Sequence, residues 1–194
     1  MNIEHWIELR CHPSHRPKEV HAIGVLVGRS ANAELQITFR LDGDISGIRV
    51  PLPGTPGIGT DLWRHTCFEA FIAAAGQTAY HEFNFAPSGE WAVYALRGYR
   101  DGVPIRDETM RPHIAVRSSS NRLELDAVIR LDSLSALHPR ASLRIGLAAV
   151  IEAGDGLSYW ALRHRAGKPD FHDAEGFALS LGPPGPERQG LIRQ

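Results

Sequence analysis

The alternation of apolar and polar side chains in two neighbouring segments constrains the fold of this chain more than any other feature of its sequence. The segments are WRHTCFEAFI (63–72) and YHEFNFAPSGEWAVY (80–94). Successive side chains of a β-strand point to opposite faces. In the first segment, Phe68 and Ile72 then share one face, and Glu69 lies on the other. The pattern predicts two adjacent strands that place carboxyl and amide groups among aromatic rings, with Glu69 on the same face as Cys67 and Phe71.

In the second segment, polar side chains also recur at every second residue. Glu82 and Asn84 share a face, opposite Phe83 and Phe85. The turn APSG (86–89) has the Pro, Ser and Gly that tight turns favour, and another strand follows at once. Because polar residues recur with period two on adjacent strands, we expect them to converge on one face of the sheet.

The rest of the chain repeats this style of short strands and turns. Further strands are expected at 3–11, 20–28, 35–41, 90–96, 114–117, 123–131, 143–151, 157–163 and 177–181. The pattern predicts an all-β fold, a two-sheet antiparallel β-sandwich of the immunoglobulin-like or jelly-roll type. We expect one domain over residues 1–182, followed by a flexible tail over 183–194.

Two long loops and one helix interrupt the strands. The Pro- and Gly-rich segment 51–60 and the polar segment 98–112 are expected to be surface loops, a place where binding residues are common. One short helix is expected over 131–139, capped by Asp132 or Ser133.

The charge, the apolar content and the cysteines of the chain indicate which partners and which location to expect. The 194 residues carry a formal net charge of -1, which gives no electrostatic case for a nucleic acid or an anionic membrane as partner. No apolar run approaches the ~20 residues of a membrane helix, and the first residues do not resemble a signal peptide. Cys11 and Cys67 lack metal-binding spacing, and we expect no disulfide between them. These features predict a cytoplasmic protein and leave its oligomeric state open.

Three blocks of the sequence together resemble the DOMON-like ligand-binding domains, bacterial relatives of the family 9 carbohydrate-binding modules. The blocks are WRHTCFEAFI, YHEFNFAPSGEWAVY and YWALRHRAGKPDFH (159–172), and the resemblance extends from LRCHP (9–13) to FALSL (177–181). It implies a β-sandwich that binds a small ligand and catalyses nothing. Within that superfamily, the implied ligands are sugars in some branches and haem in others.

A sugar site needs flat apolar rings beside fixed polar groups. Trp63, Trp91 and Trp160 are the candidate rings, although tryptophan also fills cores. We expect Trp160 to be exposed, because its strand leads straight into a polar loop. The candidate ligand-binding residues are Trp63, His65, Glu69, Glu82, Asn84, Trp91, Trp160, Arg163, His164, Lys168, Asp170 and His172.

Three other functions are alternatives to sugar binding. A glycoside hydrolase would use Glu69 and Glu82 as its pair of carboxyl groups. A haem-binding module would need an axial ligand such as His81 in an apolar slot. The His and Asp residues of the loop 164–173 match no established metal spacing, and we interpret that loop as a rigid polar turn. The sequence favours a non-enzymatic module for a carbohydrate-like small molecule, with no cofactor and no metal.

Overall fold

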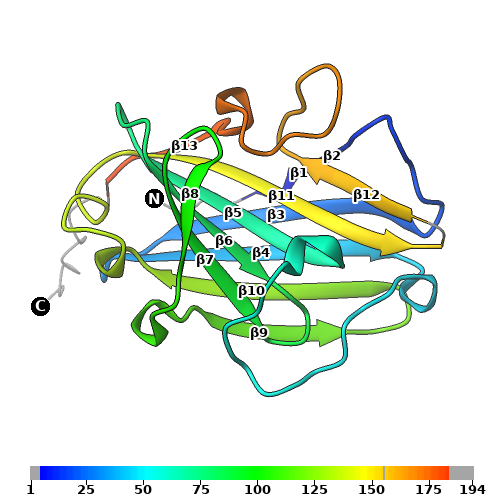
Figure 1. Ribbon diagram of the computed structural model, residues 1–194. Coiled ribbons are helices and arrows are strands. Elements are labelled where there is room, and N and C mark those ends of the chain that lie inside the picture. Colours follow the sequence, from blue (N-terminus) through cyan, green and yellow to red (C-terminus); the bar gives the residue numbers. More distant parts are fainter. Residues whose placement is uncertain (1–4, 155, 184–194) are drawn as a thin grey trace, which may run out of the picture.

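Two antiparallel sheets pack face to face in the computed structural model, which describes residues 5–154 and 156–183 (Figure 1). The smaller sheet has the strand order β1-β3-β4-β10-β9. Its strands are β1 (Ile7–Glu8), β3 (Val20–Arg29), β4 (Glu34–Gly43), β9 (His113–Ser118) and β10 (Arg122–Arg130). The predicted two-sheet β-sandwich is confirmed.

The larger sheet has the order β2-β12-β11-β5-β6-β7-β8, and β13 pairs with the start of β11. Its strands are β2 (Arg10–Cys11), β5 (Cys67–Ala74), β6 (Tyr80–Phe85), β7 (Trp91–Gly98), β8 (Asp101–Ile105), β11 (Leu143–Ala153), β12 (Gly156–Ala161) and β13 (Leu179–Leu181). The two segments that carry the alternating pattern become β5, β6 and β7, which are neighbours in this sheet.

The main core lies between the sheets and is built by alternation on both of them. On β4, Phe39 is fully buried and its ring lies 5.0 Å from that of Phe68 on β5. On β6, Phe83 and Phe85 stack within the same core with their ring centroids 6.0 Å apart. The opposite faces of β5 and β6 therefore point away from the smaller sheet, and they carry the polar residues.

The prediction of a helix over 131–139 is wrong. Only a single 3-10 turn forms there, η4 (Leu131–Ser133), and its N-cap residue Arg130 makes no side-chain cap. Ser135 instead bonds His138 and accepts from a backbone N–H, and these local bonds compete with a helix. All helical elements of the described residues are 3-10 turns; the others are η1 (Ile45–Gly47), η2 (Leu62–Arg64), η3 (Glu108–Met110) and η5 (Ala174–Gly176).

Two other expectations about local structure are corrected. The polar segment 98–112 contains an edge strand, β8, that pairs with β7. Four of the five residues of β8 are exposed, so the strand has no buried face and its sequence lacks the alternation from which a strand is predicted. The expected strand 3–11 is two short strands in different sheets, β1 against β3 and β2 against β12. Residues 3–4 of that strand and 184–194 of the predicted tail lie outside the described residues.

The two cysteines are free thiols. Cys11 is on β2 and Cys67 on β5, with β12 and β11 between them in the sheet. Three steps of about 4.8 Å separate such strands, whereas a disulfide needs Cα atoms within about 7 Å. Within the described part of the chain, none of the helical turns has the length and apolar character to cross a membrane.

Candidate functional site

The outer face of the larger sheet carries the predicted group of polar side chains. Glu69 on β5 lies opposite Asn84 on β6, and Glu82 lies opposite Phe71. Asn84 Nδ2 donates to Glu82 Oε1 at 2.7 Å, and the Cys67 thiol contacts Asn84 Oδ1 at 3.6 Å. The predicted convergence of Glu69, Glu82 and Asn84 on one face is therefore confirmed.

A cavity of about 600 Å³ opens above these carboxyl groups. Its floor comes from strands β5, β6, β7, β11 and β12, and its walls come from the η2 turn and from the loop between β12 and β13. The lining residues are Ser14, Asp61, Trp63, Glu69, Glu82, Tyr94, Arg100, Val150, Tyr159, Lys168, Pro169, Phe171 and His172. Side chains from distant parts of the sequence thus meet around the two carboxyl groups.

Burial dominates the chemistry of the two glutamates. Glu69 is 3% exposed and Glu82 is 8% exposed. Burial raises the pKa of Glu69 well above its usual value, and the nearby Glu82 adds to the effect. Burial also raises the pKa of Glu82, against opposing contributions from the Asn84 hydrogen bond and the charge of Arg100. No described side chain makes a hydrogen bond to the Glu69 carboxyl group.

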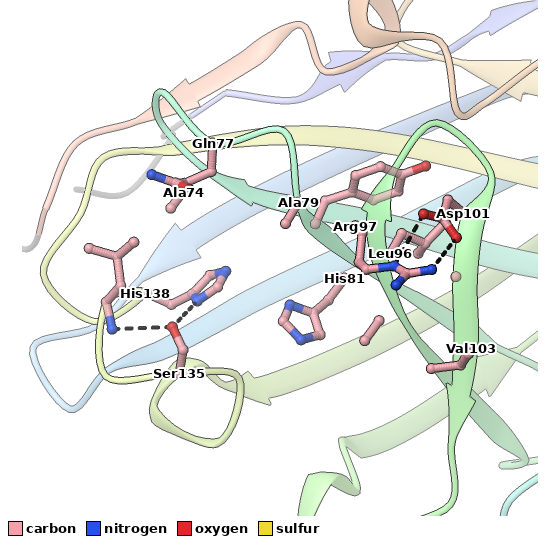
Figure 2. A pocket seen from close by; sticks show the side chains of 14 residues that line it. Ala74, Gln77, Ala79, His81, Leu96, Arg97, Asp101, Val103, Ser135 and His138 are labelled. Carbon is pink, nitrogen blue, oxygen red and sulfur yellow. Dashed lines mark hydrogen bonds and ion pairs between the residues drawn. The ribbon is translucent and has the colours of Figure 1, made fainter.

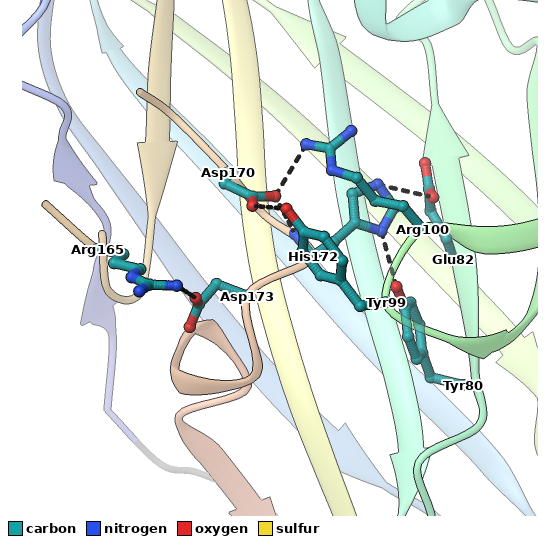
Figure 3. A network of polar contacts seen from close by, with 8 residues as sticks. All are labelled: Tyr80, Glu82, Tyr99, Arg100, Arg165, Asp170, His172 and Asp173. Atoms are coloured by element: carbon teal, nitrogen blue, oxygen red, sulfur yellow. Dashed lines mark hydrogen bonds and ion pairs between the residues drawn. The ribbon is translucent and has the colours of Figure 1, made fainter. Parts of the chain in front are cut away.

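His172 connects the loop between β12 and β13 to the floor (Figure 3). Its Nδ1 lies 2.8 Å from the Tyr80 hydroxyl, and its Nε2 lies 3.7 Å from Glu82 Oε2. Burial and then the charge of Arg100 lower the pKa of His172 to about 4, so the ring is neutral at pH 7. The contact with Glu82 is therefore no ion pair at that pH.

A second set of contacts fixes the same loop (Figure 3). Asp170 accepts from the Tyr99 hydroxyl at 2.6 Å and from Arg100 at 2.9 Å, and its Oδ1 accepts from the His172 backbone N–H at 3.1 Å. These bonds lower the pKa of Asp170 although burial opposes them. Asp170 thus positions Arg100 and His172 and is not itself a lining residue of the cavity.

Of the three candidate tryptophans, only Trp63 lines the cavity. It is 45% exposed, it lies in the η2 turn before β5, and the Arg64 guanidinium lies 5.1 Å from its ring. Trp91 and Trp160 are 0% and 6% exposed and belong to the core between the sheets. The expectation that Trp160 is exposed is wrong, because alternation on β12 turns Tyr159 outward and Trp160 inward, where its indole N–H donates to Ser158 Oγ.

The remaining candidates divide between the cavity and its surroundings. Lys168 lines the cavity rim, and Asn84 is buried beneath the floor. His65 lies on the surface, where its Nδ1 is 2.8 Å from Glu152. His164 donates from Nε2 to the Arg10 carbonyl oxygen, and Arg163 is exposed outside the cavity. The cavity that holds Glu69 and Glu82 is thus not lined by His65, Arg163 or His164.

Sequence reasoning missed eight of the lining residues, which are Ser14, Asp61, Tyr94, Arg100, Val150, Tyr159, Pro169 and Phe171. Tyr94 and Tyr159 could have been found by extending the alternation of β5 and β6 into their neighbours, because Tyr94 lies opposite Glu82 in the register. Phe171 and Arg100 come from connecting segments, which have no periodic signal. Their position follows only from the way in which the connecting segments fold over the sheet.

His81, on which the haem alternative depends, lies in a different cavity of about 520 Å³ at the end of the sandwich (Figure 2). Its ring faces His138 with 5.4 Å between centroids. Leu96, Val103 and Leu137 contribute apolar surface to this second cavity. In the described part of the chain, no group of three or more His, Cys, Asp and Glu side chains has an arrangement suited to a metal ion.

Comparisons with known proteins identify the fold. No family model matches the chain, and no curated protein matches it. A solved structure from Bacteroides uniformis, provisionally named a carbohydrate-binding protein, is 12% identical with a TM-score of 0.63, over 81% of this chain and 75% of that chain. A family 9 carbohydrate-binding module from Caldicellulosiruptor kristjanssonii in complex with cellotriose is 9% identical with a TM-score of 0.50, over 84% of this chain and 74% of that chain. At these identities, the likeness establishes a shared β-sandwich fold.

Proposed function

We propose that the chain binds a small carbohydrate-like molecule in the cavity above Glu69 and Glu82, without catalysing a reaction on it. The observation that carries this proposal is the buried carboxyl group of Glu69, which has no hydrogen-bond partner among the described residues and lies in the same cavity as the half-exposed ring of Trp63. Sugars have apolar C–H faces that pack on aromatic rings and hydroxyl groups that need polar partners.

The shape and lining of the cavity support this proposal. Its volume of about 600 Å³ falls in the range of small-molecule sites, about 300–1,000 Å³. Tyr94, Tyr159 and Phe171 add aromatic surface, while Arg100 and Lys168 add donors at the rim. The two solved structures with the same fold, one of them holding cellotriose, are consistent with a sugar as ligand. The resemblance to DOMON-like domains implies a small-molecule ligand, which is a sugar in some branches and haem in others.

The same two carboxyl groups are the pair that a glycoside hydrolase would use. A glycosidase needs two carboxyl groups whose surroundings separate their pKa values, so that one acts as an acid and the other as a base or nucleophile. Burial raises the pKa of Glu69 well above its usual value, whereas the Asn84 hydrogen bond and the charge of Arg100 oppose the effect of burial on Glu82, so a hydrolase is the second candidate function. Both groups are suited to exchange hydrogen bonds with hydroxyl groups, which is what a binding module requires.

A glycan array followed by calorimetry on the ligand it identifies tests the proposal. Trp63→Ala should weaken binding at least about tenfold, which corresponds to about 1.4 kcal/mol. Trp6→Ala is the matched control, since Trp6 is 37% exposed and packs against Arg40 of the smaller sheet, away from the cavity. Absence of binding to any glycan, or equal effects of the two variants, would count against a sugar site at Trp63.

A further inference from the structure

The Glu69 carboxyl group has no cationic partner among the described residues. Of the two basic residues that line the cavity, Arg100 is engaged by Asp170 at 2.9 Å, and Lys168 is exposed at the rim. No salt bridge to Glu69 forms among the described residues. The carboxyl group nevertheless lines the cavity, so a bound molecule can reach it.

A buried carboxyl group in this situation has two ways to lower its free energy. It can hold a proton, or it can pair with a cation that enters the site. Glu82 lies diagonally across from Glu69 on the neighbouring strand and brings a second buried carboxyl group to the same floor. A cation bound near both groups stabilises their ionised forms and offsets the repulsion by which ionisation of either disfavours ionisation of the other.

The rings around the floor also suit a cation. Trp63, Tyr94 and Tyr159 line the same cavity as Glu69. The faces of aromatic rings carry negative electrostatic potential and attract ammonium groups, most strongly where water is excluded. A neutral polyol makes use of the rings and the hydrogen bonds, but it does not stabilise an ionised carboxyl group on the floor.

We propose that the cavity selects amino sugars, with the ammonium group of the ligand against Glu69 and the sugar ring against the aromatic side chains. This inference rests on the proposed function and adds the chemical class of the ligand. A free primary amine distinguishes the preferred ligand from neutral sugars and from N-acetylated sugars, whose amide carries no charge.

Binding should then release a proton. An ammonium group beside Glu69 favours its ionised form, so the complex holds fewer protons than the free protein and ligand. Affinity therefore rises with pH until the amine of the ligand loses its own proton. The other titratable groups that line the cavity or lie beneath its floor are Asp61, Cys67, Glu82, Tyr94, Arg100, Tyr159, Lys168 and His172.

Calorimetry with matched sugar pairs tests the inference. The probes are D-glucosamine, D-galactosamine and D-mannosamine, each beside its neutral parent sugar and its N-acetyl derivative. At pH 7, at least one amine should bind about tenfold or more tightly than both of its partners. Titrations in two buffers of different ionisation enthalpy should show proton release for the amine alone.

Two Glu→Gln variants separate the role of Glu69 from a general effect of charge. Glu69→Gln should reduce the preference for the amine to within about threefold. Glu152→Gln is the matched control and should leave the preference unchanged, because Glu152 pairs with Arg49 and His65 outside the cavity.

The outcomes distinguish the two proposals. Equal affinity for an amine and its neutral parent overturns the amino-sugar inference and leaves the sugar site in place. Retention of the preference in Glu69→Gln overturns the assignment to Glu69. Failure of every sugar, charged or neutral, overturns the proposed function, and the inference falls with it.

Discussion

His81→Phe should make the protein less sensitive to acid. In the second cavity, the His81 Nδ1 is buried and has no hydrogen-bond partner among the described residues (Figure 2). Burial, and then the nearby His138, lower the pKa of His81 to about 4. A phenyl ring keeps the apolar packing at this position and cannot take up a proton.

The sign and size of the effect follow from proton linkage. In the unfolded chain the pKa of His81 is near 6.5, so between pH 6.5 and 4 the unfolded state binds more protons than the folded state. The stability contributed by His81 is therefore complete above pH 6.5 and is lost as the pH falls toward 4. At about 1.4 kcal/mol per pH unit, the whole interval corresponds to about 3 kcal/mol. Partial exposure of the ring to solvent reduces the expected loss to about 1–2 kcal/mol.

Urea unfolding at pH 7.0 and pH 4.5, followed by circular dichroism, measures the difference. The free energy of unfolding of the wild type should fall by about 1–2 kcal/mol more than that of His81→Phe between the two pH values. His21→Phe is the matched control, since His21 is exposed on β3, and it should follow the wild type. Equal losses for the wild type and His81→Phe would refute the assignment of acid sensitivity to this ring.

Three further variants test the core, a close backbone contact and the binding floor. Trp91→Ala should cost about 3–5 kcal/mol of stability because Trp91 is fully buried, whereas thermal melts of the half-exposed Trp63→Ala should show a clearly smaller loss. Gly43→Ala should cost about 2–3 kcal/mol because its Cβ would overlap a backbone oxygen of the residue before β3; Gly54→Ala meets nothing within 4 Å and should melt like the wild type. Glu69→Gln should stabilise the protein at pH 7 by about 1–3 kcal/mol in urea unfolding, since the pKa of the buried carboxyl group is raised and its ionisation opposes folding; a loss of stability would show that the carboxyl group has a partner in the fold.

The sequence determined which side chains share a face within each strand. Alternation is a local property of extended backbone, so it predicts that Glu82 and Asn84 share a face, and the pairing of β5 with β6 brings Glu69 to the same face. The same rule predicted the β-sandwich, because short alternating strands bury their apolar faces only by stacking two sheets. The domain limit at residue 182 and the cytoplasmic location stay predictions.

Tertiary structure alone decided which face of a strand meets the core and which segments cover the site. Trp160 and Tyr159 are adjacent aromatic residues, and only the pairing of β12 with β11 turned the tryptophan inward. The Tyr80 hydroxyl meets His172 across 92 residues of sequence. Contacts of that kind depend on how a connecting segment folds over a finished sheet, and such segments carry no periodic pattern from which their path can be predicted.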